Sequence, residues 1–255
     1  KNYSRIIMKT PIETLNSEVT LEGKTILVTG SSGGIGRSVA LACAGMGATV
    51  ILNGRNLTAL NEIYDSILSQ GNPEPAIVEL DLAEATEAEY INLCGIVKSS
   101  IGSLHGVVHC ATHLTELGRI NQLDLTSWEQ LFRVNVIAPA LLIKNCEPLF
   151  AESGYGSVVL TSDNHALSLD AYWSGYAISK SALNAYATLQ SNEWHGQKSY
   201  RINLVTPGPI NSPMRSRTHP GEDRGHLRSI DSLVPTYLYL LSDSSHDISG
   251  ENFGY

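Results

Sequence analysis

The chain has 255 residues, 42% of them hydrophobic, which is enough for one large core and a single α/β domain. Its net charge of −8, without a basic cluster, argues against a nucleic-acid partner. Four scattered cysteines are too few for a disulfide framework, and no long apolar stretch is apparent. We therefore expect a cytoplasmic protein that does not associate with membranes.

Strands and helices alternate along the chain after a polar N-terminal stretch. Residues 1–20 are predicted to be an extension laid over a domain that spans residues 21–255. Hydrophobic patterns predict strands at 24–29, 49–53, 76–80, 104–109, 157–161 and 200–205, and helices at 37–46, 57–69, 84–100, 126–149, 172–194 and 233–241. The final residues can add an edge strand, and residues 206–228 are predicted to be a mobile loop beside a site. This order predicts a doubly wound parallel sheet with helices on both faces.

A glycine-rich turn, T-G-S-S-G-G-I-G, follows the first predicted strand at residues 29–36. Glycines let the main chain approach a ligand closely, and the first N–H groups of the next helix favour a phosphate. Glycine turns between strands and helices also occur for steric reasons alone. The strand before it and the alternation after it favour a dinucleotide pyrophosphate site.

Tyr176 and Lys180 are four residues apart on a predicted helix, so their side chains share one face. A nearby ammonium stabilises a phenolate and lowers the pKa of a tyrosine, which makes the pair a candidate general acid/base. The alternative is an ordinary pair of neighbours on a helix surface.

From residue 21 to its end the chain resembles the short-chain dehydrogenase/reductase family, a family of Rossmann-fold enzymes. Five motifs occur in the family's order: T-G-x-x-x-G-x-G at 29–36, Asp81-Leu82 after the third strand, Asn135 in a long helix, Y-x-x-x-K at 176–180, and Pro207-Gly208 after the sixth strand. The sequence G-R-N at 54–56 and a tryptophan at Trp173 are most similar to a bacterial branch of oxidoreductases.

The resemblance implies an oxidoreductase that interconverts a small-molecule carbonyl and an alcohol by hydride transfer. It implies that Tyr176 gives or takes the proton, that Lys180 holds the nicotinamide ribose and lowers the tyrosine pKa, and that Asn135 supports a relay water. These three residues are also expected to contact the cofactor. The other cofactor-binding residues that it implies are Gly30, Ser32, Gly34, Ile35 and Gly36 in the turn, Asp81 and Leu82 at the adenine, Ala111 at the adenosine ribose, and Pro207, Gly208, Ile210 and Ser212 over the nicotinamide.

The end of the second strand indicates which dinucleotide binds. NAD enzymes usually place a carboxylate there for the ribose hydroxyl, whereas an arginine suits the extra phosphate of NADP. The chain has Asn53-Gly54-Arg55 at this point. We therefore expect Arg55 to bind that phosphate, with NADP(H) preferred and NAD(H) as the second option.

Two positions depart from the family pattern. The family's catalytic serine normally lies thirteen residues before the tyrosine, where this chain has Asp163, with Ser162 next to it. Neighbouring strand residues point to opposite faces, so Ser162 replaces the missing hydroxyl only if the strand end is shifted. An ionised Asp163 cannot donate to a carbonyl and opposes a phenolate, whereas a protonated Asp163 could donate. Thr112 stands where the family usually has a glycine that permits close approach of the cofactor, and a β-branched residue tolerates a positive φ poorly, so we expect weaker cofactor binding.

These departures leave two functions open: an NADP(H)-dependent oxidoreductase, or a cofactor-binding regulator or assembly protein with impaired catalysis. A nucleotide-sugar epimerase or dehydratase is disfavoured because little chain follows Pro207 to build a substrate domain. We expect His113 and His165 to be hydrogen-bonded or solvent-facing and predict no metal. A homodimer or homotetramer is expected through the helices at 126–149 and 172–194, because family members use them and the second carries small residues, Ala177, Ala182, Ala185 and Ala187.

Overall fold

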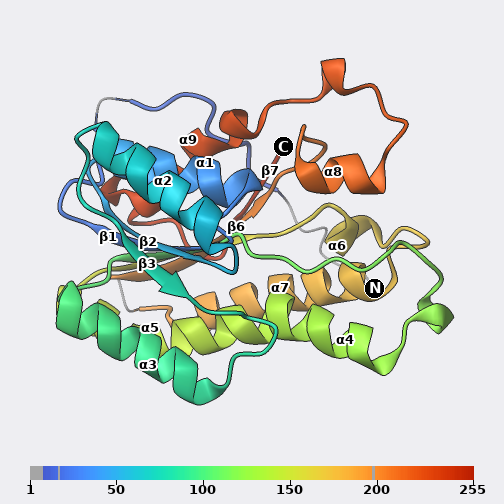
Figure 1. Cartoon of the computed structure of the whole chain (residues 1–255), viewed down its shortest axis with the longest axis horizontal. Helices are drawn as coiled ribbons and strands as arrows, with labels where there is room; N and C mark the ends of the chain where they lie inside the picture. The colour runs from blue at the N-terminus through green and yellow to red at the C-terminus, as the bar shows by residue number, and fades with distance from the viewer. Residues whose placement is uncertain (1–7, 17, 197–198) are drawn as a thin grey trace.

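The computed structural model describes residues 8–16, 18–196 and 199–255 and contains a seven-stranded parallel sheet of order β3-β2-β1-β4-β5-β6-β7 (Figure 1). The strands are β1 (Thr25–Thr29), β2 (Thr49–Gly54), β3 (Ala76–Glu79), β4 (Gly106–His109), β5 (Gly156–Thr161), β6 (Tyr200–Thr206) and β7 (Asn252–Gly254). The helices are α1 (Gly34–Gly45), α2 (Leu57–Ser69), α3 (Glu87–Ser100), α4 (Leu125–Phe132), α5 (Ala138–Ser153), α6 (His165–Ser168), α7 (Ser174–Glu193), α8 (Pro213–Thr218) and α9 (Val234–Leu241). The predicted fold class and the edge strand at the C-terminal end are confirmed.

Helices cover both faces of the sheet and bury its strands. One core cluster joins α3, α5 and α7 to one face, and a second joins α1, α2 and α9 to the other (Figure 1). Strands covered on both sides are continuous apolar runs, and every residue of β1 and β4 is buried. Strand β1 has β2 on one side and β4 on the other. The chain therefore runs from β1 outward to β2 and β3 and then returns to continue with β4 in the opposite direction across the sheet. The crevice at such a switch point is the usual ligand site of doubly wound sheets.

The helix predicted at 126–149 differs from the observed one. It begins at Leu125, because Asp124 is its N-cap and accepts a hydrogen bond from Ser127 N at 2.8 Å. A π-helical segment, Arg133–Ile137, separates α4 from α5. The whole stretch, Leu125–Ser153, is long and apolar enough to cross a membrane by length and composition, which the sequence reading overlooked. Half of its most apolar 18-residue stretch is buried inside the fold, and core helices of globular proteins have the same length and composition.

Two other segments are more ordered than the sequence indicated. The predicted loop at 206–228 contains the short helix α8 and a 3₁₀ turn, Arg224–His226. In the N-terminal segment, Lys9 bridges Phe253 of β7, and Ile12 N donates to the hydroxyl of Thr236 on α9 at 2.9 Å. The extension therefore lies along the β7 edge, although residues 1–7 and 17 of it are outside the described residues.

Candidate active site

A cavity of about 1020 Å³ opens at the carboxyl ends of the central strands. It is lined by the glycine turn after β1, the segments after β2 to β6, and parts of α7 and α8. Every residue predicted to act in catalysis or cofactor binding lines this cavity except Asn135, which lies behind it. The structure therefore brings together segments that are far apart in the sequence.

The backbone of the glycine turn is packed so closely against its neighbours that two of its positions have no space for a side chain. Gly30 has φ of 68°, and a Cβ there would lie 2.7 Å from the backbone nitrogen of Ala111. A Cβ on Gly36 would meet the carbonyl of Gly30. Gly33 is the N-cap of α1 and has no side chain to cover its first turn. This arrangement suits a pyrophosphate at the helix N-terminus, so the residues present fit a dinucleotide.

At one end of the cavity, Asn53 and Arg55 at the end of β2 lie beside Asp81, which follows β3. Asn53 is buried, and its Nδ2 donates to Val78 O on the neighbouring strand at 3.0 Å. Arg55 Nη1 lies 3.8 Å from Asp81 Oδ2, and the arginine side chain is 70% exposed. An ion pair this exposed is weak and does not prevent the guanidinium from turning to a phosphate.

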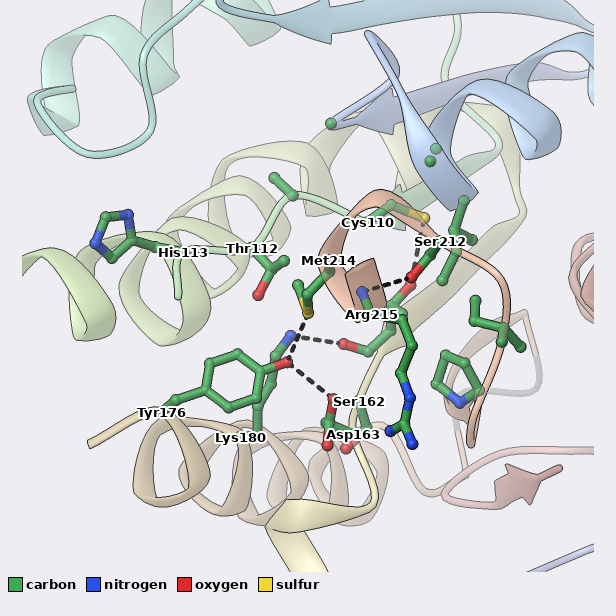
Figure 2. Close-up of a pocket in the computed structure, with 18 of the residues that line it drawn as sticks. Cys110, Thr112, His113, Ser162, Asp163, Tyr176, Lys180, Ser212, Met214 and Arg215 are labelled. Carbon is green, nitrogen blue, oxygen red and sulfur yellow. Dashed lines mark hydrogen bonds between the residues drawn. The ribbon is translucent and has the colours of Figure 1, made fainter. Parts of the chain in front are cut away.

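Tyr176 and Lys180 are buried on α7 and point into the cavity from the same side (Figure 2). Lys180 Nζ donates to the carbonyl of Thr161 at the end of β5, at 2.9 Å. The hydroxyl of Tyr176 donates to Asp163 Oδ2 at 3.0 Å, as the dashed line in Figure 2 shows. Lys180 lies 5.9 Å from the centre of the tyrosine ring, so the two side chains are neighbours without a direct hydrogen bond.

The expected lowering of the Tyr176 pKa by Lys180 is wrong for this structure. Burial, followed by the charge of Asp163 and the hydrogen bond to it, raises the pKa of Tyr176 well above its ordinary value. Burial lowers the pKa of Lys180 to about 8, and Asp163 opposes part of that change. Of the two charged neighbours, Asp163 therefore has the larger effect on the pKa of Tyr176, because its carboxylate contacts the hydroxyl and the ammonium of Lys180 does not.

Asp163 is itself held by His165, a partner that the sequence analysis did not pair with it. His165 donates to Asp163 Oδ1 from its backbone nitrogen at 2.8 Å, and its ring Nδ1 lies 2.6 Å from the same oxygen. The imidazole stacks on Trp173 with ring centres 3.4 Å apart. Burial raises the pKa of Asp163, but the bonds from His165 and the charge of Lys180 outweigh it, so the pKa lies below its ordinary value. The protonated form considered from the sequence is thus disfavoured.

Comparison with known proteins identifies the family. The sequence pattern of the short chain dehydrogenases matches residues 24–223. The uncharacterized oxidoreductase YciK of Escherichia coli K12 is 33% identical over 91% of this chain and 92% of its own length. The chain belongs to the short-chain dehydrogenase/reductase family. A cyclohexanol dehydrogenase of Acinetobacter is 27% identical over 90% of this chain and 92% of that enzyme.

Solved structures of bacterial short-chain dehydrogenases have the same fold. A putative short chain dehydrogenase from Escherichia coli CFT073, complexed with NADPH, has a TM-score of 0.89 at 33% identity and covers 94% of this chain and 99% of that one. Its counterpart from Shigella flexneri, complexed with NADP, has a TM-score of 0.88 at 31% identity, with the same coverage of both chains. Dinucleotides of the NADP type are therefore bound by members of this family that are close to the chain in fold.

In this member of the family, Ser162 does not stand in for the missing serine. Its hydroxyl donates to Asn184 Oδ1 on α7 at 2.5 Å, whereas Asp163 faces Tyr176. Successive residues point in opposite directions here, as in an undistorted strand end. Asn135 lies in the π-helical segment, where its side chain bonds to both backbone polar groups of His113 and to the hydroxyl of Ser179.

Thr112 does not have the positive φ that was considered for its position. The non-glycine residues with positive φ in the described ranges are Leu169 and Tyr172, which precede α7, and Ser174, its first residue. Thr112 Oγ1 donates to Asn135 Oδ1 at 3.1 Å, so the hydroxyl helps to fix the segment that follows β4. Thr112 therefore has no backbone strain of that kind, and the weaker cofactor binding expected from its side chain stays a prediction.

The segment after β6 closes the remaining side of the cavity. Gly208 has φ of 64°, and Ser212 caps α8 by accepting from Arg215 N at 3.2 Å. Met214 Sδ lies 3.8 Å from the hydroxyl of Tyr176. Sequence reasoning missed this methionine, because nothing in a polar loop indicates which of its side chains turns inward.

Proposed function

We propose that this short-chain dehydrogenase is an NADP(H)-dependent oxidoreductase that interconverts a small-molecule carbonyl and an alcohol by hydride transfer. The observation that carries the proposal is the meeting of the Tyr176 hydroxyl and the glycine turn in one cavity. A proton donor beside a dinucleotide site is the arrangement that such a reaction requires.

Several residues would hold the dinucleotide. The backbone of the glycine turn would bind the pyrophosphate, Asp81 and Leu82 would border the adenine, and the exposed Arg55 would bind the ribose phosphate of NADP. The neighbours bound to NADPH and NADP support this preference. NAD(H) would bind more weakly, because without that phosphate the guanidinium gains no charge-assisted contact. When bound, the nicotinamide supplies the hydride acceptor or donor.

The chain's own residues would transfer the proton and orient the cofactor and the substrate. Lys180 uses one N–H on Thr161, and its remaining N–H groups are available to ribose hydroxyls. Tyr176 would exchange the proton with the substrate oxygen, and the ring stack of His165 on Trp173 would form a wall beside it. The segment from Pro207 to Ser212 would cover the nicotinamide.

The test is turnover of NADP(H) with a panel of alcohols and carbonyls that begins with cyclohexanol and cyclohexanone. We expect Tyr176→Phe to lower kcat by about a thousand-fold, because it removes the acid/base group. The Kd of NADPH should change by less than about threefold, since the ring remains. Tyr186→Phe, further along α7 and away from the cavity lining, where the hydroxyl bonds to Gln190, is the matched control and should retain full activity.

A cofactor-binding regulator with impaired catalysis is the second candidate. Asp163 favours it, because a carboxylate at the serine position raises the pKa of Tyr176 and cannot donate to a carbonyl. NADPH binding without turnover of any compound in the panel would support this candidate and contradict the enzyme.

We also propose a homodimer or homotetramer in the cytoplasm. Apolar side chains are exposed on the helical faces that family members use for assembly: Leu125, Ile137, Ile178 and Leu189. The free cysteines suit a reducing compartment. Light scattering at micromolar concentration should give two or four chains, and a monomer would contradict the assembly.

A further inference from the structure

The most unusual feature of the site is a carboxylate on the hydroxyl of the acid/base tyrosine. Asp163 Oδ2 accepts from Tyr176 at 3.0 Å, while Oδ1 is occupied by His165 (Figure 2 shows the first of these bonds). The phenol proton is thus already directed at an acceptor within the protein. We propose that Asp163 is the terminal proton acceptor of the reaction and that Tyr176 conducts the proton to it.

The step rests on the proposed function and balances as follows. The alcohol's C–H electron pair leaves as hydride to the nicotinamide of NADP⁺, and the O–H bonding pair becomes the second carbon–oxygen bond. The alcohol's proton passes to Tyr176 Oη as the phenol's own proton passes to Asp163 Oδ2. The products are a carbonyl, NADPH and a neutral Asp163, which then returns its proton to water. Reduction runs through the same positions in reverse.

The surroundings make Tyr176 a poor base on its own. Burial and the charge of Asp163 raise the pKa of the phenol well above its ordinary value, so the phenolate is scarce at neutral pH. Lys180 cannot offset this, because its ammonium is bonded to Thr161 and not to the phenol. Asp163, by contrast, is ionised at neutral pH, since its pKa lies below the ordinary value. A concerted transfer through Tyr176 therefore needs no free phenolate.

His165 acts on this step as a positioning residue. Its backbone and ring nitrogens hold Oδ1, which leaves Oδ2 aimed at the phenol. The ring is kept in place by the stack on Trp173, and its Nε2 lies 3.7 Å from Asp170 Oδ2. The other charged groups that act on Asp163 are Lys180 on α7 and Arg215 on α8, and Arg215 is itself paired with Glu222 at 2.6 Å.

The pH profile of alcohol oxidation tests the proposal. With Asp163 as acceptor, kcat/KM for cyclohexanol, or for the fastest alcohol of the panel, should stay within about threefold between about pH 5.5 and about pH 7.5. If Tyr176 alone were the base, kcat/KM would rise about tenfold per pH unit, because the phenolate fraction does. Asp163→Asn should convert the flat profile into the rising one and lower kcat/KM about a hundred-fold near pH 6.

Three further measurements keep the test decisive. Asp65→Asn, which removes an exposed carboxylate of α2 away from the cavity lining, should leave both the rate and the flat profile unchanged. His165→Gln should lower kcat about tenfold with little change in KM and with the profile still flat, as expected of a positioning residue. Melting curves and the Kd of NADP⁺ show whether the Asp163→Asn protein is folded, and Asp163→Ser provides a second variant.

A rising profile in the wild type, or an unchanged profile in both Asp163 variants, would overturn the role of Asp163 and leave the proposed function standing. A wild-type protein that binds NADP⁺ but turns over no alcohol or carbonyl at any pH would overturn both.

Discussion

The two sides of the cavity obtain their geometry in different ways. On the side proposed to bind the nucleotide (the nucleotide side), around β1, α1 and β2, glycines stand where the backbone has a positive φ or a close neighbour, as at Gly30. On the side proposed to carry the catalytic groups (the catalytic side), around β5, α6 and α7, Tyr172 and Ser174 hold positive φ values of 74° and 34° with full side chains. Such conformations cost of the order of 1–3 kcal/mol each and persist only where the surroundings impose them.

The difference teaches that the nucleotide side depends on the backbone and the catalytic side on side-chain partners. The glycine turn would bind through main-chain groups, which any sequence with the right glycines supplies. Asp163 depends instead on a hydroxyl from α7 and two nitrogens from His165. We therefore expect the glycine turn to lose function when a substitution adds atoms, and the Asp163 site to lose function when a substitution removes a hydrogen-bond partner.

The largest effect is expected from adding one methyl group to the nucleotide side. Gly30→Ala would place a Cβ 2.7 Å from Ala111 N at a positive φ, so NADP⁺ affinity should fall about a hundred-fold and stability by about 2 kcal/mol. Titration calorimetry and urea unfolding measure the two effects. Gly45→Ala is the matched control, because Gly45 ends α1 away from the cavity lining, has no positive φ, and an added Cβ there meets no atom within 4 Å among the described residues. Equal losses in both variants would contradict the backbone explanation.

A smaller effect is expected at Arg55, the charged side chain proposed to bind the ribose phosphate. Arg55→Gln should weaken NADP⁺ binding about tenfold, because a charge-assisted bond is lost, and should leave NAD⁺ binding unchanged. Titrating both dinucleotides measures the ratio. Lys98→Gln, an exposed residue of α3 paired with Glu152, should alter neither affinity. Tighter binding of NAD⁺ than NADP⁺ by the wild type would refute the cofactor preference.

The smallest effect is expected on the catalytic side, in the stability of variants at Tyr172. Tyr172 is exposed and has a positive φ, so Tyr172→Gly should relieve strain and raise the free energy of unfolding by about 1 kcal/mol. Tyr172→Ala removes the same ring but retains a Cβ, and it should give no gain. Urea unfolding of the two variants distinguishes strain from lost contacts. Equal stabilities would mean that the segment before α7 is not strained.

Much of the fold could be predicted because its signals are local. Each strand is a short apolar run, and the glycine turn marks the passage from β1 to α1. The predicted ends of helices were less accurate where a capping hydrogen bond fixes the first residue. Thr126 and Ser127 are reasonable caps by residue type, but Asp124 caps α4 because its carboxylate reaches Ser127 N.

The sequence by itself determined the parallel α/β architecture, the family and the clustering of the motif residues at one sheet edge, because spacing and periodicity carry that information. Only the tertiary structure decided which groups touch. It paired Tyr176 with Asp163 and Asp163 with His165, turned Ser162 towards Asn184, and so reversed the expected direction of the tyrosine pKa. The physical reason is that a pKa depends on burial and on contacts of a few ångströms, which chain positions do not specify.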